Sequence, residues 1–185
     1  MIPSINDSHH CTSLRKESMK KLFLLRHARA GSAPSGKSDL DRPLTEEGEK
    51  AAHHLGKKLA HKDLLPDMAL FSTARRAEFT WTNLVQGAKT PLPAEGSDWL
   101  YHATPHDIIT HLRHLPDTFD SIMIIGHNPT LHSLAHDLAK SSDHASKLAG
   151  SFPPGTLAIF RFSISSWQEI SKDRASLEHI FFPEE

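Results

Sequence analysis

Residues 21–28 read Lys-Leu-Phe-Leu-Leu-Arg-His-Ala. The apolar run over 22–25 is short enough for one β-strand and too short for an independent helix. Apolar side chains on both faces are typical of a strand buried between helices in a mostly parallel sheet. The run stops at Arg26 and His27, where such sheets bind ligands, just beyond the carboxyl ends of their strands. A guanidinium beside an imidazole suits an anion site next to a nucleophile or base, but the same pair also suits a solvated strand end.

The composition predicts a single compact domain. The chain has 185 residues, of which 38% are hydrophobic and 23% charged, and its net charge is −1, so a sizeable core is expected. There is no basic excess that would indicate nucleic acid or a membrane surface as a partner. One cysteine gives neither a disulfide framework nor a thiolate zinc cluster. No apolar run reaches the roughly 18 residues of a membrane span. A cytoplasmic location is therefore expected.

The first 18 residues are polar and unpatterned, and we expect them to form a disordered extension ahead of a folded domain over residues 19–185. His9, His10 and Cys11 could bind a metal ion only with a fourth ligand, and none lies nearby in the sequence. We therefore expect no metal site in this extension.

The rest of the chain alternates strand and helix patterns, which predicts an α/β layered domain. The expected strands cover 21–25, 68–71, 121–125, 156–162 and 177–182, the last at a sheet edge, and the expected helices cover 45–60, 74–85, 104–114 and a segment beginning at Pro129. Residues 87–98 read as a loop with at most a short extended piece. Asn128 is a favourable N-cap, and Pro129 suits the first helical position.

Two arginines, Arg75 and Arg76, lie in the first turn of the second expected helix. The helix dipole disfavours cations there, so their placement is best explained by an anion bound alongside them. The alternative is a structural ion pair with Glu78 or Asp67.

Two further residues stand close to the expected strand ends. His127 lies between the carboxyl end of a strand and the start of a helix, which is another place where folds of this class bind anions. Arg42 is ambiguous, because it could line the mouth of a site or pair with Asp39 or Asp41.

Together these segments resemble the histidine phosphatase superfamily, also called phosphoglycerate-mutase-like. The resemblance rests on Arg26-His27 after the first strand, on the segment Ser72-x-x-x-Arg76-Ala77-x-x-Thr80, and on Gly126-His127. It implies a three-layer domain with a mostly parallel central sheet flanked by helices. Three more segments resemble the small phosphohistidine phosphatase branch, namely Asp41-Arg42-Pro43-Leu44-Thr45-x-x-Gly48, Leu100-Tyr101-x-Ala103 and Gly126-His127-Asn128-Pro129.

The resemblance implies that His27 is the nucleophile that accepts the phosphoryl group, and that Arg26, Arg76 and His127 bind its oxygens. These roles agree with the chemistry, since a phosphoryl group in transfer spreads negative charge over three oxygens. Two neighbouring guanidiniums also lower the pKa of a histidine, so that it stays neutral and able to attack. Neither a metal nor another cofactor is then expected.

Two departures from the wider family bear on the substrate. Mutases carry a longer helical insertion before the second histidine motif, whereas here one helix beyond the Arg76 helix is expected, which suggests an open site suited to a protein surface. Many members also have a glutamate general acid near Leu100-Tyr101, where this chain has His102. His102 is therefore a candidate general acid. Glu78, Glu95 and Asp98 are weaker candidates.

Phosphohistidine as substrate would explain the missing acid, because its imidazole can leave as a neutral group once its far nitrogen is protonated. The sequence thus predicts a metal-independent phosphatase, acting through phospho-His27 on phosphohistidine in a partner protein. The alternatives are a phosphomonoesterase for a small phosphate ester and an inactive phosphate-binding module. The oligomeric state stays open.

Overall fold

The protein is described here by a computed structural model, which describes residues 19–140, 148 and 150–183. The predicted extension over residues 1–18 lies outside them. Six strands form one mixed sheet in the order β3-β2-β4-β1-β5-β6, with β5 antiparallel to both of its neighbours. The strands are β1 (Lys20–Arg26), β2 (Met68–Ser72), β3 (Ala94–Ser97), β4 (Ser121–Gly126), β5 (Leu157–Phe162) and β6 (Ala175–Phe181); the α-helices are α1 (Glu46–His61), α2 (Arg75–Ala88), α3 (Pro105–Leu112) and α4 (Thr130–Ala139).

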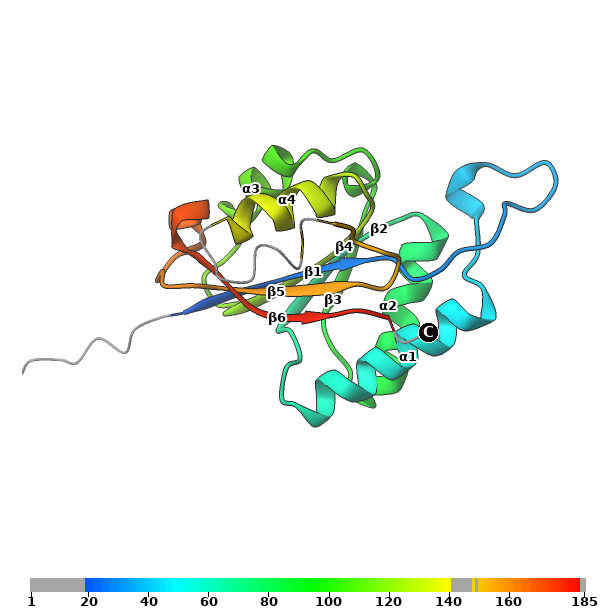
Figure 1. The fold of residues 1–185 in the computed structure, drawn as a ribbon, viewed down its shortest axis with the longest axis horizontal. Helices are drawn as coiled ribbons and strands as arrows, with labels where there is room; N and C mark the ends of the chain where they lie inside the picture. The colour runs from blue at the N-terminus through cyan, green and yellow to red at the C-terminus, as the bar shows by residue number, and fades with distance from the viewer. Residues whose placement is uncertain (1–18, 141–147, 149, 184–185) are drawn as a thin grey trace, which may run out of the picture.

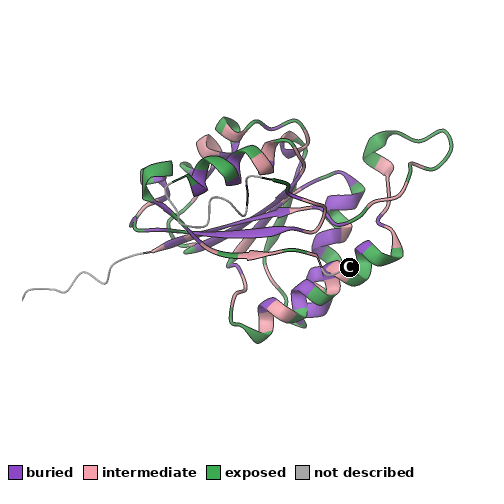
Figure 2. Cartoon of the chain, viewed as in Figure 1, coloured by how far each residue is buried: buried purple, intermediate pink, exposed green. Residues whose placement is uncertain are grey.

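Helices cover both faces of the sheet (Figure 1). Alternate residues of β1 and β4 point to opposite faces, as the period of a strand requires. Leu22, Leu24 and Ile124 pack in the core beneath α3 and α4, whereas Phe23 and Leu25 pack in the core beneath α1 and α2. In Figure 2 the central strands are coloured as buried, and so are parts of the helices on both sides of the sheet. The predicted three-layer α/β architecture is confirmed.

Helices α1 and α2 pack closely because each has a glycine that faces the backbone of the other helix. A Cβ atom on Gly56 would lie 1.9 Å from the Leu84 carbonyl oxygen, and one on Gly87 would lie 1.9 Å from the His53 carbonyl oxygen. Neither position tolerates a side chain without separating the helices. This contact fixes α2, whose first turn carries Arg76.

Residues 94–97 form a short parallel strand, β3, at the edge of the sheet, which is the short extended piece allowed within the predicted loop over 87–98. Two other local expectations need adjustment. Asn128 does not cap α4: Pro129 takes the N-cap position, and the Asn128 Oδ1, the atom that would accept a capping bond, has no hydrogen-bond partner among the described residues. Its Nδ2 donates to the Phe152 carbonyl at 3.0 Å. Strand β6 begins at Ala175, two residues before the predicted strand, and it lies at the sheet edge as expected.

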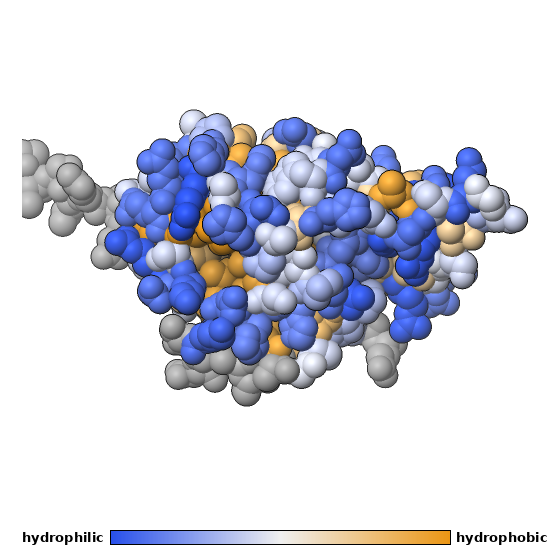
Figure 3. All heavy atoms as spheres, turned by 90° about the horizontal axis from the view of Figure 1, so that it is seen from above, coloured by the Kyte–Doolittle hydropathy of each residue, from blue (hydrophilic) through white to orange (hydrophobic). Residues whose placement is uncertain are grey.

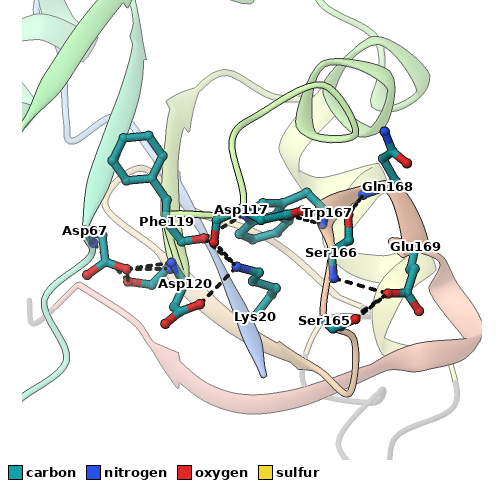
Figure 4. A network of polar contacts seen from close by, with 11 residues as sticks. Lys20, Asp67, Asp117, Phe119, Asp120, Ser165, Ser166, Trp167, Gln168 and Glu169 are labelled. Carbon is teal, nitrogen blue, oxygen red and sulfur yellow. Dashed lines mark hydrogen bonds and ion pairs between the residues drawn. The ribbon is translucent and has the colours of Figure 1, made fainter. Parts of the chain in front are cut away.

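The end of β1 away from Arg26 is held by a buried lysine, Lys20, which is 1% exposed. Its ammonium group donates to the carbonyls of Asp117 and Phe119 and to the Asp120 carboxylate, at 2.7–3.0 Å. The Trp167 indole lies beside it and also donates to the Phe119 carbonyl (Figure 4). A buried cation is tolerated only with such full pairing, so this network serves to anchor the strand.

The surface seen in Figure 3 is mainly hydrophilic, with apolar residues in small areas between the polar ones. Leu40 and Phe182 are the large hydrophobic side chains that are most exposed among the described residues. No helix within residues 19–140 or 150–183 is both long and apolar enough to cross a membrane.

Candidate active site

Strands β1, β4 and β2 are parallel neighbours, so their carboxyl ends lie at the same end of the sheet. The three predicted site segments, which follow these strands, therefore come close together. Arg26 pairs in register with Gly126, and the His27 amide donates to the Gly126 carbonyl at 3.1 Å. His27 and His127 therefore emerge side by side, with ring centroids 5.2 Å apart. Strand β2 ends at Ser72 and leads into α2, which supplies Arg76.

His27 is buried, and its two ring nitrogens have distinct surroundings. Nδ1 lies 2.8 Å from the Ala28 carbonyl oxygen, which can only accept, so Nδ1 carries the proton in the neutral ring. Nε2 accepts from the Arg76 Nε–H at 3.3 Å. Burial, followed by the charges of Arg76, Arg26 and Arg42, lowers the His27 pKa from 6.5 to about 4. At neutral pH the ring is uncharged and its Nε2 lone pair faces the guanidinium.

Arg76 is the hub of the cluster and is 5% exposed. Its Nη1 donates to the Asp39 carbonyl at 2.7 Å, and its Nη2 to the Asp39 carboxylate at 2.9 Å. Nη2 also lies 3.4 Å from Nδ1 of His127. A cation at the start of α2 is thus balanced by one carboxylate, and it contacts both histidines.

His127 is oriented by a buried serine. Its Nε2 lies 2.8 Å from Ser72 Oγ, which also accepts from the Ala74 amide at 3.3 Å. Because Arg76 can only donate, Nδ1 of His127 is the acceptor and Nε2 carries the proton. Burial, with the charges of His27 and Arg76, lowers the His127 pKa to about 3.

Arg26 approaches the cluster from the end of β1. Its Nη1 donates to the Phe152 carbonyl at 2.7 Å, the same oxygen that Asn128 contacts. Its buried Nε has no hydrogen-bond partner among the described residues. The charge of Arg26 lowers the pKa of both His27 and His127. Four predicted site residues, His27, Arg26, Arg76 and His127, therefore meet in one place.

Two members of the site were not predicted as site residues: Asp39, and Tyr101, which the sequence marked only as part of the Leu100-Tyr101-x-Ala103 segment. The Tyr101 hydroxyl donates to the Asp39 carboxylate at 2.6 Å, and the ring lies edge-on to His127 and beside Arg76. Hydrogen bonds from Tyr101, Arg42 and Arg76 lower the Asp39 pKa to about 2. Nothing in the polar loop around residue 39 distinguished this aspartate from its neighbours. Arg42 pairs with Asp39 at 3.2 Å, as one of its two predicted roles requires, and its charge also lowers the His27 pKa.

The other candidates lie outside this cluster. Arg75 is exposed and sits over the Phe79 ring, so only one of the two adjacent arginines enters the site. His102 is exposed and packs edge-on against Tyr101; a role in proton transfer stays a prediction. Glu78 and Glu95 are exposed, and Asp98 accepts a hydrogen bond from Thr73. Within the described part of the chain, no group of three or more His, Cys, Asp or Glu could hold a metal ion.

Comparison with known proteins agrees with this geometry. A model of the histidine phosphatase superfamily (branch 1) matches residues 22–97. The uncharacterized protein Rv1276c of Mycobacterium tuberculosis is 30% identical over 163 residues, which cover 86% of this chain and 99% of that protein.

Two solved structures are similar over most of their length. A SixA protein from Nakamurella multipartitia has a TM-score of 0.77 at 27% identity and covers 89% of this chain and 96% of its own. A SixA protein from Agrobacterium tumefaciens has a TM-score of 0.76 at 26% identity and covers 89% and 98%. The chain belongs to the histidine phosphatase superfamily, in its small SixA-like branch.

Proposed function

We propose that this protein is a phosphatase that works through a phosphohistidine formed on Nε2 of His27, and that it removes phosphate from phosphohistidine in a partner protein. The observation that carries the proposal is the orientation of His27. Its Nδ1–H is held by the Ala28 carbonyl at 2.8 Å, and its Nε2 lone pair faces the Arg76 guanidinium at 3.3 Å.

In the first step the Nε2 lone pair forms a bond to phosphorus while the bond between phosphorus and the leaving group breaks. The ring gains a positive charge, which is shared with the proton on Nδ1, and the Ala28 carbonyl stabilises that charge. Arg26 and Arg76 bind the phosphoryl oxygens, on which negative charge is spread during transfer. The two guanidiniums supply the positive charge that stabilises these oxygens, so no step is assigned to a metal.

In the second step water forms a new bond to phosphorus, and the P–Nε2 bond breaks. His27 leaves as a neutral imidazole, and the protons of the attacking water stay with the inorganic phosphate or pass to solvent. An anion beside His127 favours its protonated form, so bound phosphate would favour this ring as a third cationic ligand beside Arg26 and Arg76.

The choice of substrate rests on the leaving group. A phosphohistidine whose far nitrogen is protonated leaves as neutral imidazole, whereas an alkoxide needs a proton donor. The carboxylate found in the site, Asp39, has a pKa of about 2, so it holds no proton to donate at neutral pH. The two SixA structures are described as candidate phosphohistidine phosphatases, which supports the same substrate class.

The test is to trap the intermediate. The protein is mixed with a ³²P-labelled phosphohistidine protein and quenched in alkali within milliseconds to seconds, and the labelled peptide is sequenced by mass spectrometry. We expect acid-labile, alkali-stable label on His27 in the wild type and none in His27→Ala. His53→Ala, which changes a histidine of α1 away from the cluster, serves as the matched control and should label normally.

Parallel turnover measurements separate the substrate classes. Release of phosphate from the phosphohistidine protein is compared with release from a panel of sugar and nucleotide phosphates, with and without a chelator. We expect the phosphohistidine protein to be the better substrate and the chelator to have no effect. Turnover of the esters alone would reject the substrate class, and label that persists in His27→Ala would reject the mechanism.

A further inference from the structure

We propose that Thr80 is a positioning residue for the phosphatase reaction: its hydroxyl joins the loop that carries the nucleophile His27 to the helix turn that carries Arg76. This inference rests on the proposed function for its kinetic part. Its structural part, the fixed orientation of the His27 ring, can be tested without any turnover.

Thr80 lies in α2 and is 1% exposed. Its hydroxyl accepts a hydrogen bond from the Ala28 amide at 2.9 Å and donates one to the Arg76 carbonyl at 2.6 Å. The single hydroxyl proton and one lone pair are thus both used, and they connect two segments 52 residues apart in the chain.

Both backbone polar groups of Ala28 are hydrogen-bonded. Its N–H is bonded to Thr80, and its carbonyl accepts the Nδ1–H of His27 at 2.8 Å. That second bond, together with the Arg76 Nε–H donated to Nε2, keeps the proton of His27 on Nδ1 and leaves the lone pair for attack on Nε2. Thr80 is the described partner of the Ala28 amide, so its hydroxyl holds the peptide unit between His27 and Ala28, from which the His27 side chain and the Ala28 carbonyl both extend.

The same hydroxyl also sets the position of Arg76 relative to His27. The Arg76 carbonyl is bonded to Thr80, while its Nε lies 3.3 Å from His27 Nε2. The nucleophile and its guanidinium partner therefore share one buried anchor. A misplacement of reacting groups by about 1 Å costs on the order of 100-fold in rate, so this anchor matters for chemistry as well as for folding.

A neighbouring threonine supplies a matched control. The Thr82 hydroxyl makes the equivalent bond to a carbonyl four residues earlier, that of Glu78, at 3.1 Å. Thr82 is exposed, and its bond to the Glu78 carbonyl stays within the helix. Any effect that arises from replacing a helical threonine by valine, with loss of this local bond, will appear in both variants.

The experiment compares wild type with Thr80→Val, Thr80→Ser and Thr82→Val. Thr80→Ala is a second hydroxyl-free variant that avoids any packing effect of the valine methyl group. Two quantities are measured well below the unfolding temperature: kcat on a phosphohistidine protein, and the ¹⁵N shifts of the His27 ring at pH 7.5, which report its tautomer. Unfolding curves show the folded fraction of each variant.

We expect wild type, Thr80→Ser and Thr82→Val to show a single Nδ1–H tautomer and kcat values within about threefold of one another. Thr80→Val and Thr80→Ala should show mixed tautomers and a kcat lowered by about 10- to 100-fold. A hydroxyl-free variant that keeps both the wild-type kcat and the single tautomer would overturn the proposal, even if the variant is less stable. If wild type itself forms no phospho-His27, the proposed function fails, whereas the tautomer comparison still decides the role of Thr80.

Discussion

The depressed pKa of His27 gives a prediction whose size follows directly from the site. Burial and the charges of Arg76, Arg26 and Arg42 lower this pKa from 6.5 to about 4. At pH 5.5 an imidazole with the ordinary pKa is only about 10% neutral, whereas His27 should be about 97% neutral. His27 should therefore remain neutral and nucleophilic at a pH that would protonate an ordinary histidine.

The same shift makes stability depend on pH, and the sign follows from proton uptake. As the pH falls from 7.5 to 4.5, residue 27 takes up a proton in the unfolded chain but mostly not in the folded one. The contribution of the neutral His27 ring to the free energy of unfolding is thus fully present above pH 6.5 and is lost as the pH falls toward 4. The two pKa values correspond to a loss of about 2–3 kcal/mol in the free energy of unfolding at pH 4.5.

The assay combines two measurements on wild type and His27→Gln, whose side chain does not titrate. NMR titration of the His27 ring, assigned by its absence in the variant, should give a midpoint near 4. Urea unfolding followed by tryptophan fluorescence at pH 7.5 and 4.5 should show a larger loss of stability in wild type. A midpoint near 6.5, or equal losses in the two proteins, would refute the reasoning.

Three other substitutions test separate parts of the structure. Gly56→Ala should lower the free energy of unfolding by about 2–3 kcal/mol in urea denaturation, because its Cβ would lie 1.9 Å from the Leu84 carbonyl oxygen; an unchanged midpoint would contradict the close helix contact. Arg76→Lys should lower kcat/KM by about 100-fold, since lysine cannot reproduce the forked contacts, whereas the exposed Arg75→Lys should change it by less than about twofold. His102→Ala should leave turnover of phosphohistidine within about threefold of wild type, because no proton donor is needed for a neutral leaving group; a loss of about 100-fold would identify His102 as the general acid.

Much of the fold could be predicted from the sequence because its signals are local. The apolar runs at 22–25 and 122–125 are buried on both faces, and they form the paired central strands β1 and β4. His27 and His127 could be placed together because both follow parallel strands, whose carboxyl ends share one edge. The edge strand β3 was predicted only as a short extended piece within a loop, because Pro91 and Pro93 precede it and its residues Ala94, Glu95 and Gly96, which prove exposed, carry no apolar pattern.

The rest of the site depends on contacts between distant segments, which no local pattern encodes. Asp39 and Tyr101 are 62 residues apart and meet through one hydrogen bond. Arg75 and Arg76 are adjacent and chemically identical, and only the rotation of α2 decides that Arg76 enters the cluster while Arg75 stays exposed. Asn128 suited a helix cap by its residue type, but its Nδ2 donates to the Phe152 carbonyl of a separate loop, and its Oδ1 accepts no bond from the described residues.

The central claim is that Nε2 of His27 attacks phosphorus while Arg26, Arg76 and His127 bind the oxygens. A crystal structure with bound vanadate tests it most directly, because vanadate can mimic the five-coordinate arrangement around phosphorus. The account predicts vanadium within bonding distance of Nε2 of His27, with its oxygens on the two guanidiniums and on His127. Vanadium bound to another atom, or oxygens that leave Arg76 without contact, would contradict it.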